Sequence, residues 1–302
     1  MKFSIWPSFD RPWAEVLHLA QYIERNGLHA LWYADHFMGQ TDDDTAGDGP
    51  ALECWTVLAA IAAAVPRIRL TSMVSPVTIH HPVVLAKRAT TVDHVSGGRA
   101  VLGIGAGWQV NEHTAYGFEL APPGERVSRF AEAIEVIHRL LRQPRTDMAG
   151  RHYRLTDAPF EPKPLQTTLP ILVGTGSPRM LGLTARWADE WNTWGDPTQV
   201  AERTQLFMQA CGAAGRDPST IRRSAQALVF LTDSDAARDK LRPMAPPGRS
   251  LVGGPTELID LIGRFVEQGV DEFAIPDFTL GATAEQRMHI IERLHAEVLS
   301  AF

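Results

Sequence analysis

Short runs of apolar residues alternate along the chain with longer segments whose apolar residues recur every three or four positions. The short runs predict eight strands, at residues 2–6, 29–34, 68–74, 100–104, 171–173, 190–193, 225–231 and 272–275. The longer segments predict helices at residues 12–26, 51–65, 82–95, 125–142, 178–187, 199–214, 236–241, 256–268 and 284–299. This alternation indicates parallel strands joined by right-handed crossovers. Eight such units in 302 residues fit a closed (β/α)₈ barrel, the TIM-barrel architecture, better than an open sheet.

Two insertions interrupt the repeating pattern, but neither resembles a linker, so we expect a single domain over residues 1–302. Residues 39–50, GQTDDDTAGDGP, are polar, acidic and rich in glycine, and they follow the second predicted strand. Loops that follow barrel strands lie on the catalytic face, so this insertion could form a lid. Residues 143–169 precede the fifth strand and contain a predicted hairpin around RHYRL.

Composition narrows the class of protein. The chain has 29 basic and 35 acidic residues and a net charge of −6, which argues against nucleic acid as the main partner. No run of apolar residues is long enough for a membrane span, and the first residues lack the apolar segment of a signal peptide. Cys54 and Cys211 have no CxxC spacing, which indicates buried thiols in a reducing compartment. We therefore expect a cytoplasmic protein with a small-molecule substrate.

Unusual residues gather at the carboxyl ends of five predicted strands. These clusters are residues 35–37, 72–76, 103–108, 174–178 and 191–192. In a (β/α)₈ barrel they would face one rim, which is where such enzymes place their active sites. No G-x-S-x-G elbow and no P-loop lysine motif occurs, which argues against hydrolases and kinases. His80 and His81 lack a third ligand at suitable spacing, so we predict no metal site.

The turn formed by Gly174, Thr175, Gly176 and Ser177 lies between a strand and a helix that begins with Pro178. Glycines let an anion approach the backbone closely, and a helix N-terminus carries free N–H groups and partial positive charge. Thr175 and Ser177 can add hydroxyl donors. The turn therefore predicts a phosphate site, although an ordinary tight turn would also favour these residues.

The segment from Gly103 to Gly107 resembles a dinucleotide-binding fingerprint only in part, because G-x-G-x-x-G would require glycine where this chain has Trp108. We interpret it instead as backbone that passes flat against a ring or tail of a ligand. The alternative is a turn of small residues needed for packing within the barrel.

His36 follows Asp35 at the end of the second predicted strand. A histidine there can donate a proton or a hydrogen bond to a reacting group, although many single histidines are structural. Asp35 could tune the local charge. Because adjacent residues on a strand point to opposite faces, we do not expect a direct relay between Asp35 and His36.

Together these clusters resemble a known group of proteins. The segments LWYADHF, LTSMVSPVTIHHPVVLAK, GGRAVLGIGAGWQVNEHTAYGFELAPPGERVSRFAEAIEVI, HYRLTDAPFEPKP and PILVGTGSPRMLGLTARWADEWN occur in order between residues 1 and 275. They look like the luciferase-like monooxygenase superfamily and, more narrowly, its coenzyme F420-dependent oxidoreductases. The resemblance implies the (β/α)₈ fold, a deazaflavin cofactor and hydride transfer.

The resemblance also assigns roles to individual positions. It places His36 beside the hydride-carrying carbon of the deazaflavin, with Asp35 nearby, as catalytic residues. Ser72 and Met73 match the position of a non-prolyl cis peptide that backs the ring. The implied cofactor-binding residues are Ser72, Met73, Gly105, Ala106, Gly107, Trp108, Gly174, Thr175, Gly176 and Ser177.

Departures from the family pattern bear on the substrate. Sugar-phosphate dehydrogenases of this group have a carboxylate where this chain has Trp108, and a tryptophan near the histidine is replaced around Met38 and Gly39. Their basic residues for the substrate phosphate have no clear match. These differences predict a more apolar pocket that accepts a ketone, an enone or an imine.

Three hypotheses follow. The first is an F420-dependent oxidoreductase, because a deazaflavin carries hydride without activating oxygen. The second is an FMN-dependent monooxygenase supplied with reduced flavin by a partner reductase. The third, a non-catalytic flavin-binding barrel, is disfavoured because Asp35, His36 and both glycine turns are present. By the same resemblance we expect a homodimer.

Overall fold

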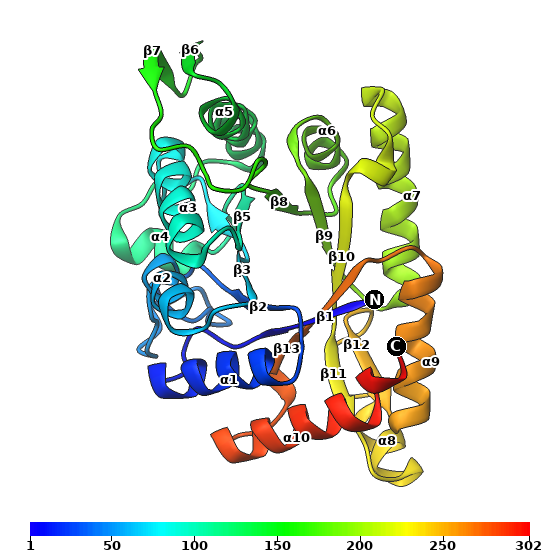
Figure 1. Ribbon diagram of the computed structural model, residues 1–302. Helices are drawn as coiled ribbons and strands as arrows, with labels where there is room; N and C mark the ends of the chain where they lie inside the picture. Colours follow the sequence, from blue (N-terminus) through cyan, green and yellow to red (C-terminus); the bar gives the residue numbers. More distant parts are fainter.

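Eight parallel strands close into a barrel in the computed structural model, which describes residues 1–302 (Figure 1). The barrel strands are β1 (Lys2–Trp6), β2 (Ala30–Tyr33), β3 (Arg69–Ser72), β5 (Ala100–Gly105), β8 (Ile171–Gly174), β9 (Glu190–Trp194), β10 (Arg222–Gln226) and β13 (Glu272–Pro276). β1 pairs with both β2 and β13, and β3 pairs with β5, so every barrel strand has two neighbours. The predicted TIM barrel is confirmed.

Helices surround the barrel (Figure 1). They are α1 (Trp13–Arg25), α2 (Cys54–Ala64), α3 (Pro82–Ser96), α5 (Pro123–Arg142), α6 (Pro178–Trp187), α7 (Pro197–Ala214), α9 (Pro255–Glu267) and α10 (Ala284–Glu297), with the shorter α4 (Val110–Tyr116) and α8 (Asp235–Leu241). Three 3₁₀ turns add Pro218–Thr220, Asp277–Thr279 and Leu299–Ala301. None of the helices is long and apolar enough to span a membrane.

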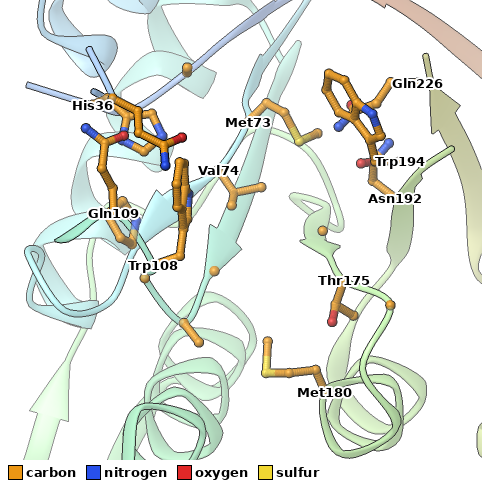
Figure 2. A pocket seen from close by; sticks show the side chains of 18 of the residues that line it. His36, Met73, Val74, Trp108, Gln109, Thr175, Met180, Asn192, Trp194 and Gln226 are labelled. Carbon is orange, nitrogen blue, oxygen red and sulfur yellow. The ribbon is translucent and has the colours of Figure 1, made fainter. Parts of the chain in front are cut away.

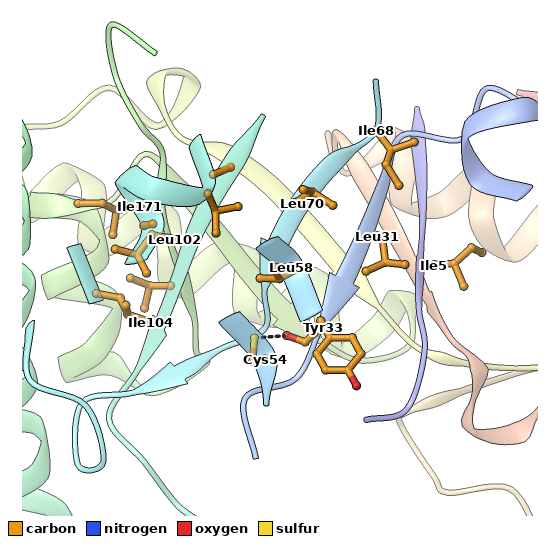
Figure 3. Packing of buried hydrophobic residues seen from close by; sticks show 14 of the residues in the cluster. Ile5, Leu31, Tyr33, Cys54, Leu58, Ile68, Leu70, Leu102, Ile104 and Ile171 are labelled. Carbon is orange, nitrogen blue, oxygen red and sulfur yellow. Dashed lines mark hydrogen bonds between the residues drawn. The ribbon is translucent and has the colours of Figure 1, made fainter. Parts of the chain in front are cut away.

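Most of the barrel strands are buried on both faces and read as continuous apolar runs, whereas β10 has the polar sequence RRSAQ. In β2, Leu31 and Tyr33 face the helices, whereas Trp32 packs inside the barrel. Figure 3 shows this outer layer, in which Leu58 and Cys54 of α2 lie close to β2. The Cys54 thiol is fully buried and faces the Tyr33 carbonyl oxygen at 3.6 Å, and this burial raises its pKa.

The seventh predicted strand, residues 225–231, is wrong in its extent. The chain leaves the barrel at Ala227, and the following β11 (Leu228–Leu231) pairs in parallel with β12 (Ser250–Gly253) in a separate sheet. The apolar run continues through the break, so hydrophobicity alone did not separate the two strands. β12 was not predicted, because it is a short strand that directly follows a loop containing Pro243, Pro246 and Pro247.

The long insertion before β8 forms the predicted hairpin, from β6 (Arg145–Ala149) and β7 (Arg154–Pro159). Two other short elements were not predicted. β4 (Ser75–Pro76) continues the line of β3 beside β5, and α4 follows β5. α4 has few apolar residues and so lacks the periodicity that predicts a helix.

The pairing of β3 with β5, the third and fourth strands of the barrel, depends on one glycine. The Ser72 hydroxyl bonds both the carbonyl oxygen and the N–H of Gly103, each at 3.0 Å. A Cβ on Gly103 would lie 1.9 Å from the Ser72 carbonyl oxygen, closer than nonbonded atoms can approach. The two strands can therefore meet here only if residue 103 has no side chain.

A network of charged residues fills the amino end of the barrel. Glu272 accepts hydrogen bonds from Ser4 Oγ at 2.5 Å and from Trp32 Nε1 at 2.9 Å, and its other oxygen lies 3.0 Å from Arg222 Nη2. Arg69 binds both carboxylate oxygens of Glu190. Because these groups satisfy one another, buried charge is tolerated at this end.

His29 belongs to this network as a neutral base. Its Nε2 accepts a hydrogen bond from Arg222 Nη2 at 3.0 Å. Burial, together with the positive charges of Arg222 and Arg69, lowers the pKa of His29 from near 6.5 to about 3. Acid therefore protonates this residue in the unfolded chain before it does so in the folded protein.

We expect the free energy of unfolding to fall with pH below about 6.5 through His29, with the loss complete near pH 3. Allowing for the 22% of the side chain that is exposed, the contribution is about 1 kcal/mol between pH 7 and pH 5. Urea unfolding of the wild type and of His29→Gln, whose amide oxygen can also accept from Arg222, measures it. An equal loss in both proteins would contradict the assignment.

The close approach at Gly103 gives a second expectation. Gly103→Ala should lower the free energy of unfolding by about 3 kcal/mol or more, because the strands must separate. The control is Gly182→Ala, at an exposed position in α6 with no atom within 4 Å of the new Cβ. It should raise stability by about 0.5–1 kcal/mol. Urea unfolding compares the two variants, and comparable effects would show that Gly103 has no special role.

Candidate active site

A cavity of about 940 Å³ opens at the carboxyl ends of the barrel strands. Ten of the twelve predicted site residues line it: His36, Met73, Gly105, Ala106, Gly107, Trp108, Gly174, Thr175, Gly176 and Ser177. Asp35 and Ser72 do not. In Figure 2, His36 and Trp108 lie on one side, Asn192 and Trp194 lie on the other, and Val74 lies between them.

His36 is held in place by Glu112, a residue of α4 that the sequence analysis did not single out. His36 Nδ1 lies 2.9 Å from Glu112 Oε1, and the other carboxylate oxygen accepts a hydrogen bond from the Phe37 N–H at 3.0 Å. The Glu112 side chain is 1% exposed, so it has no competing contact with bulk water. With Nδ1 bound to the carboxylate, Nε2 is the ring nitrogen left for a ligand.

Aromatic rings restrict His36 further. The Trp108 ring meets it edge to face, with centroids 5.6 Å apart, and the Phe9 ring lies at 5.7 Å. Trp108 is half exposed at the cavity wall, consistent with the predicted apolar wall. The histidine is thus fixed both by its carboxylate partner and by ring contacts.

Asp35 lies behind the cavity wall, where it cannot touch a ligand in the cavity. Its Oδ2 accepts a hydrogen bond from Ser75 Oγ at 2.5 Å and lies 3.0 Å from His80 Nε2. Ser75 Oγ in turn accepts from Trp55 Nε1 at 3.0 Å. Asp35 and His36 point to opposite sides of the chain, as their adjacency predicts. This places Asp35 as a support for the segment that carries Ser75.

The non-prolyl cis peptide lies between Met73 and Val74, one residue later than the predicted Ser72–Met73 position. Ser72 is still part of the regular strand, and its side chain points away from the cavity to bond Gly103. Met73 and Val74 line the cavity (Figure 2). The assignment of Ser72 to the cofactor site is therefore corrected, and Val74 takes its place on the cavity floor.

Two further glycines, Gly105 and Gly107, give the cavity wall near Val74 a surface of backbone atoms without side chains. A Cβ on Gly105 would lie 2.7 Å from Val74 Cγ2. Gly107 has φ +79°, and a Cβ there would lie 2.2 Å from Thr78 Oγ1, which also contacts His113 Nε2 at 2.8 Å. Side chains at these positions would displace the cavity floor, so the backbone itself forms the surface that a ligand would meet.

The backbone of the turn before α6 is held by hydrogen bonds to residues of β9, while N–H groups at the start of α6 stay free. The Thr175 N–H donates to the Asn192 carbonyl at 3.0 Å, and Trp191 Nε1 donates to the Thr175 carbonyl at 2.9 Å. Ser177 is the N-cap residue, yet its side chain caps no N–H of the helix. By contrast, Asp196 caps α7 through the Gln199 N–H at 2.9 Å. The start of α6 therefore keeps N–H groups that can bind an anion.

Several lining residues escaped the sequence analysis. Trp6 and Trp194 meet at 5.8 Å between ring centroids, and Phe278 lies 5.2 Å from Trp6, so aromatic rings cover the side opposite His36. Trp191, which the sequence placed at the rim, instead stacks on Phe207 outside the barrel. Alternation along β9 could have identified Trp194, because Asn192 and Trp194 share one face.

The basic lining residues are Arg126, Arg203 and Arg249. They come from α5, α7 and the loop before β12, and no sequence motif marks them.

Comparison with known proteins agrees with this geometry. An uncharacterised protein of Mycobacterium tuberculosis is 30% identical over 264 residues, covering 82% of this chain and 90% of that protein. An F420-dependent glucose-6-phosphate dehydrogenase of Kineococcus radiotolerans is 32% identical over 237 residues, covering 77% and 68%.

Among solved structures, an F420-dependent secondary alcohol dehydrogenase in complex with an F420–acetone adduct has a TM-score of 0.83. It is 18% identical, over 100% of this chain and 99% of that one, a similarity that shows the shared fold. Residues 1–251 match the family described as luciferase-like monooxygenase. The chain belongs to the luciferase-like monooxygenase family.

Proposed function

We propose that this protein is a coenzyme F420-dependent oxidoreductase that moves hydride between the deazaflavin and a small organic substrate, such as a ketone or alcohol, an enone or an imine. The observation that carries the proposal is the His36–Glu112 pair at a cavity floored by glycine backbone and bordered by an uncapped helix N-terminus. Relatives named as F420-dependent dehydrogenases support the choice of cofactor.

The residues present fit such a cofactor. Gly105, Gly107 and Val74 would hold the flat ring, because all three line the cavity and the two glycines present backbone there without side chains. The turn from Gly174 to Ser177 would hold the phosphate through backbone N–H groups. A cavity of about 940 Å³ is at the upper end of the usual range for ligand sites, as a ring, tail and substrate together require.

When bound, the deazaflavin supplies or accepts a hydride. The role of His36 is then to transfer the proton to or from the substrate oxygen or nitrogen. In reduction, protonated His36 donates that proton from Nε2; in oxidation, neutral His36 accepts it at the same atom. Glu112 keeps Nδ1 engaged in both directions and stabilises the charged ring. The aromatic side chains around the cavity exclude water from the reacting groups.

An FMN-dependent monooxygenase is the second candidate, because the family description itself names monooxygenases. It would use the same floor and phosphate turn, and a partner reductase would supply it with reduced flavin. A non-catalytic barrel is the weakest candidate, since it has no need for a histidine held by a buried carboxylate. The prediction of a homodimer stays open to measurement by light scattering.

Cofactor choice is tested by titrating the purified apoprotein with F420 and with FMN and following fluorescence. We expect saturable F420 binding, with FMN bound at least about tenfold more weakly, a difference of about 1.4 kcal/mol. Preferential micromolar binding of FMN would overturn the proposal in favour of the monooxygenase.

The roles of His36 and Glu112 are tested once a screen of ketones, enones, imines and alcohols has given a turnover substrate. We expect His36→Ala to lower kcat about 10²- to 10⁴-fold with little change in F420 affinity, because the proton donor is lost. Glu112→Gln should lower kcat less, since the imidazole remains. The control is His289→Ala, at an exposed position of α10. Unchanged turnover in His36→Ala would remove His36 from the mechanism.

A further inference from the structure

The side of the cavity across from His36 contains two buried amides among its aromatic rings. Asn192 of β9 and Gln226 of β10 both line the cavity, and they are 2% and 6% exposed. β9 and β10 pair directly, and Gln226 is the partner of Trp194 in the register. Figure 2 shows Asn192, Trp194 and Gln226 close together. A buried amide costs free energy unless its ends are hydrogen-bonded, so the partners of these two side chains indicate their role.

Ser224 determines which end of the Asn192 amide faces the cavity. The Ser224 hydroxyl donates its one hydrogen to the Trp191 carbonyl at 3.3 Å, so it can only accept from Asn192. It accepts from Nδ2 at 3.1 Å, which leaves Oδ1 as the free end of the amide. A Cβ on Gly174 would lie 3.9 Å from this Oδ1 and 3.6 Å from Val74 Cγ1. Asn192 Oδ1 is therefore a hydrogen-bond acceptor without a partner, beside the cavity floor.

The Gln226 side chain lines the cavity without a hydrogen bond to any residue, and its Oε1 is buried. The indole N–H of Trp194, its neighbour in the sheet, is also buried without a partner. Because an indole nitrogen only donates, the oxygen end of the Gln226 amide suits the Trp194 side. Nε2 is then the end that can donate to a ligand in the cavity.

Elsewhere the fold satisfies its buried indoles. Outside the cavity lining, three buried indole N–H groups are hydrogen-bonded, those of Trp32, Trp55 and Trp191. The two that lack a partner belong to Trp6 and Trp194, and both of these residues line the cavity. Buried polar groups without a partner are few in native proteins, and a ligand is one reason for them. Unmet hydrogen-bonding capacity thus gathers on this side of the cavity.

We infer that Asn192 and Gln226 bind an amide group of the substrate, and that they select carbonyl compounds that carry a carboxamide or lactam away from the reacting carbon. The inference rests on the proposed function and names its substrate class. The substrate N–H would donate to Asn192 Oδ1, and the substrate amide oxygen would accept from Gln226 Nε2. A substrate without this group leaves the ends of both side chains unpaired, and sites built for a substrate N–H discriminate strongly against analogues that lack it.

The recognised group is separate from the reacting group. His36 Nε2 serves the reacting carbonyl on one side of the cavity, whereas the amides lie on the other side (Figure 2). The rings of Trp6, Trp194 and Phe278 border the amides. A flat amide would therefore meet apolar surfaces as well as the two polar ends.

The test measures binding to the protein with oxidised F420 bound, which cannot donate hydride, so no turnover intervenes. The probes are three cyclohexenones of similar size, which carry a carboxamide, a methyl ester or an isopropyl group on the ring carbon opposite the ketone. Cofactor fluorescence follows each titration. We expect the carboxamide to bind at least about tenfold more tightly than the isopropyl compound, equivalent to about 1.4 kcal/mol, with the ester between them.

Variants assign the two contacts. Asn192→Leu removes the acceptor at similar volume, so the carboxamide should bind only as tightly as the ester, with the isopropyl compound unchanged. Gln226→Leu removes the donor and should weaken both the carboxamide and the ester. Gln21→Leu, at an exposed position of α1, is the control and should change nothing. F420 affinity should stay at the wild-type value in all three variants.

Failure of the inference is distinct from failure of the proposed function. If the wild type binds the three cyclohexenones equally, or binds none of them, the inference is wrong and the function stands; this comparison requires no variant to fold. Equal weakening of all three probes in Asn192→Leu would also overturn it, because the amide would then have a structural role. Loss of F420 affinity in either variant would place the amides at the cofactor. If F420 does not bind at all, the proposed function fails, and the inference fails with it.

Discussion

Closure of the ring of eight parallel strands determines where everything else can lie. Parallel strands buried on both faces need a neighbour on each side, and two of these neighbours, β3 and β5, meet across Ser72 and Gly103. Once the ring is closed, the carboxyl ends of all eight strands share one rim. His36, Val74 and Thr175, which come from distant parts of the sequence, therefore line a single cavity.

The charged residues that line the cavity are mainly basic, whereas the molecule as a whole has a negative net charge. A chain with net charge −6 presents three unpaired arginines and an open helix N-terminus to one cavity. The single carboxylate there is bound to His36 and Phe37. The cavity thus has basic side chains as well as an aromatic side that includes Trp6 and Trp194.

Hydrophobic periodicity was sufficient to predict most of the barrel, because most of its strands are apolar and most of its helices are amphipathic. It reached only the last two residues of β10, whose sequence RRSAQ is polar. It could not locate the break at Ala227, where one apolar run supplies two strands, or α4, whose buried residues are polar. Glycine and histidine clusters at strand ends predicted one part of the cavity lining, which includes His36 and the turn from Gly174 to Ser177. Glu112 was missed because, in the sequence, a carboxylate in a short polar segment cannot be distinguished from one on a solvated surface. Only the fold brings Glu112 to His36.

The charged residues at the two ends of the barrel differ in how they are paired. At the amino end, Arg69 and Arg222 pair with Glu190 and Glu272. At the carboxyl end, Arg126, Arg203 and Arg249 line the cavity without a carboxylate partner. Trp6, Trp108 and Trp194 line the cavity and take no part in the network of charged residues at the amino end. This separation allows the chemistry at the carboxyl end of a (β/α)₈ barrel to change during evolution while the amino end keeps its stabilising contacts.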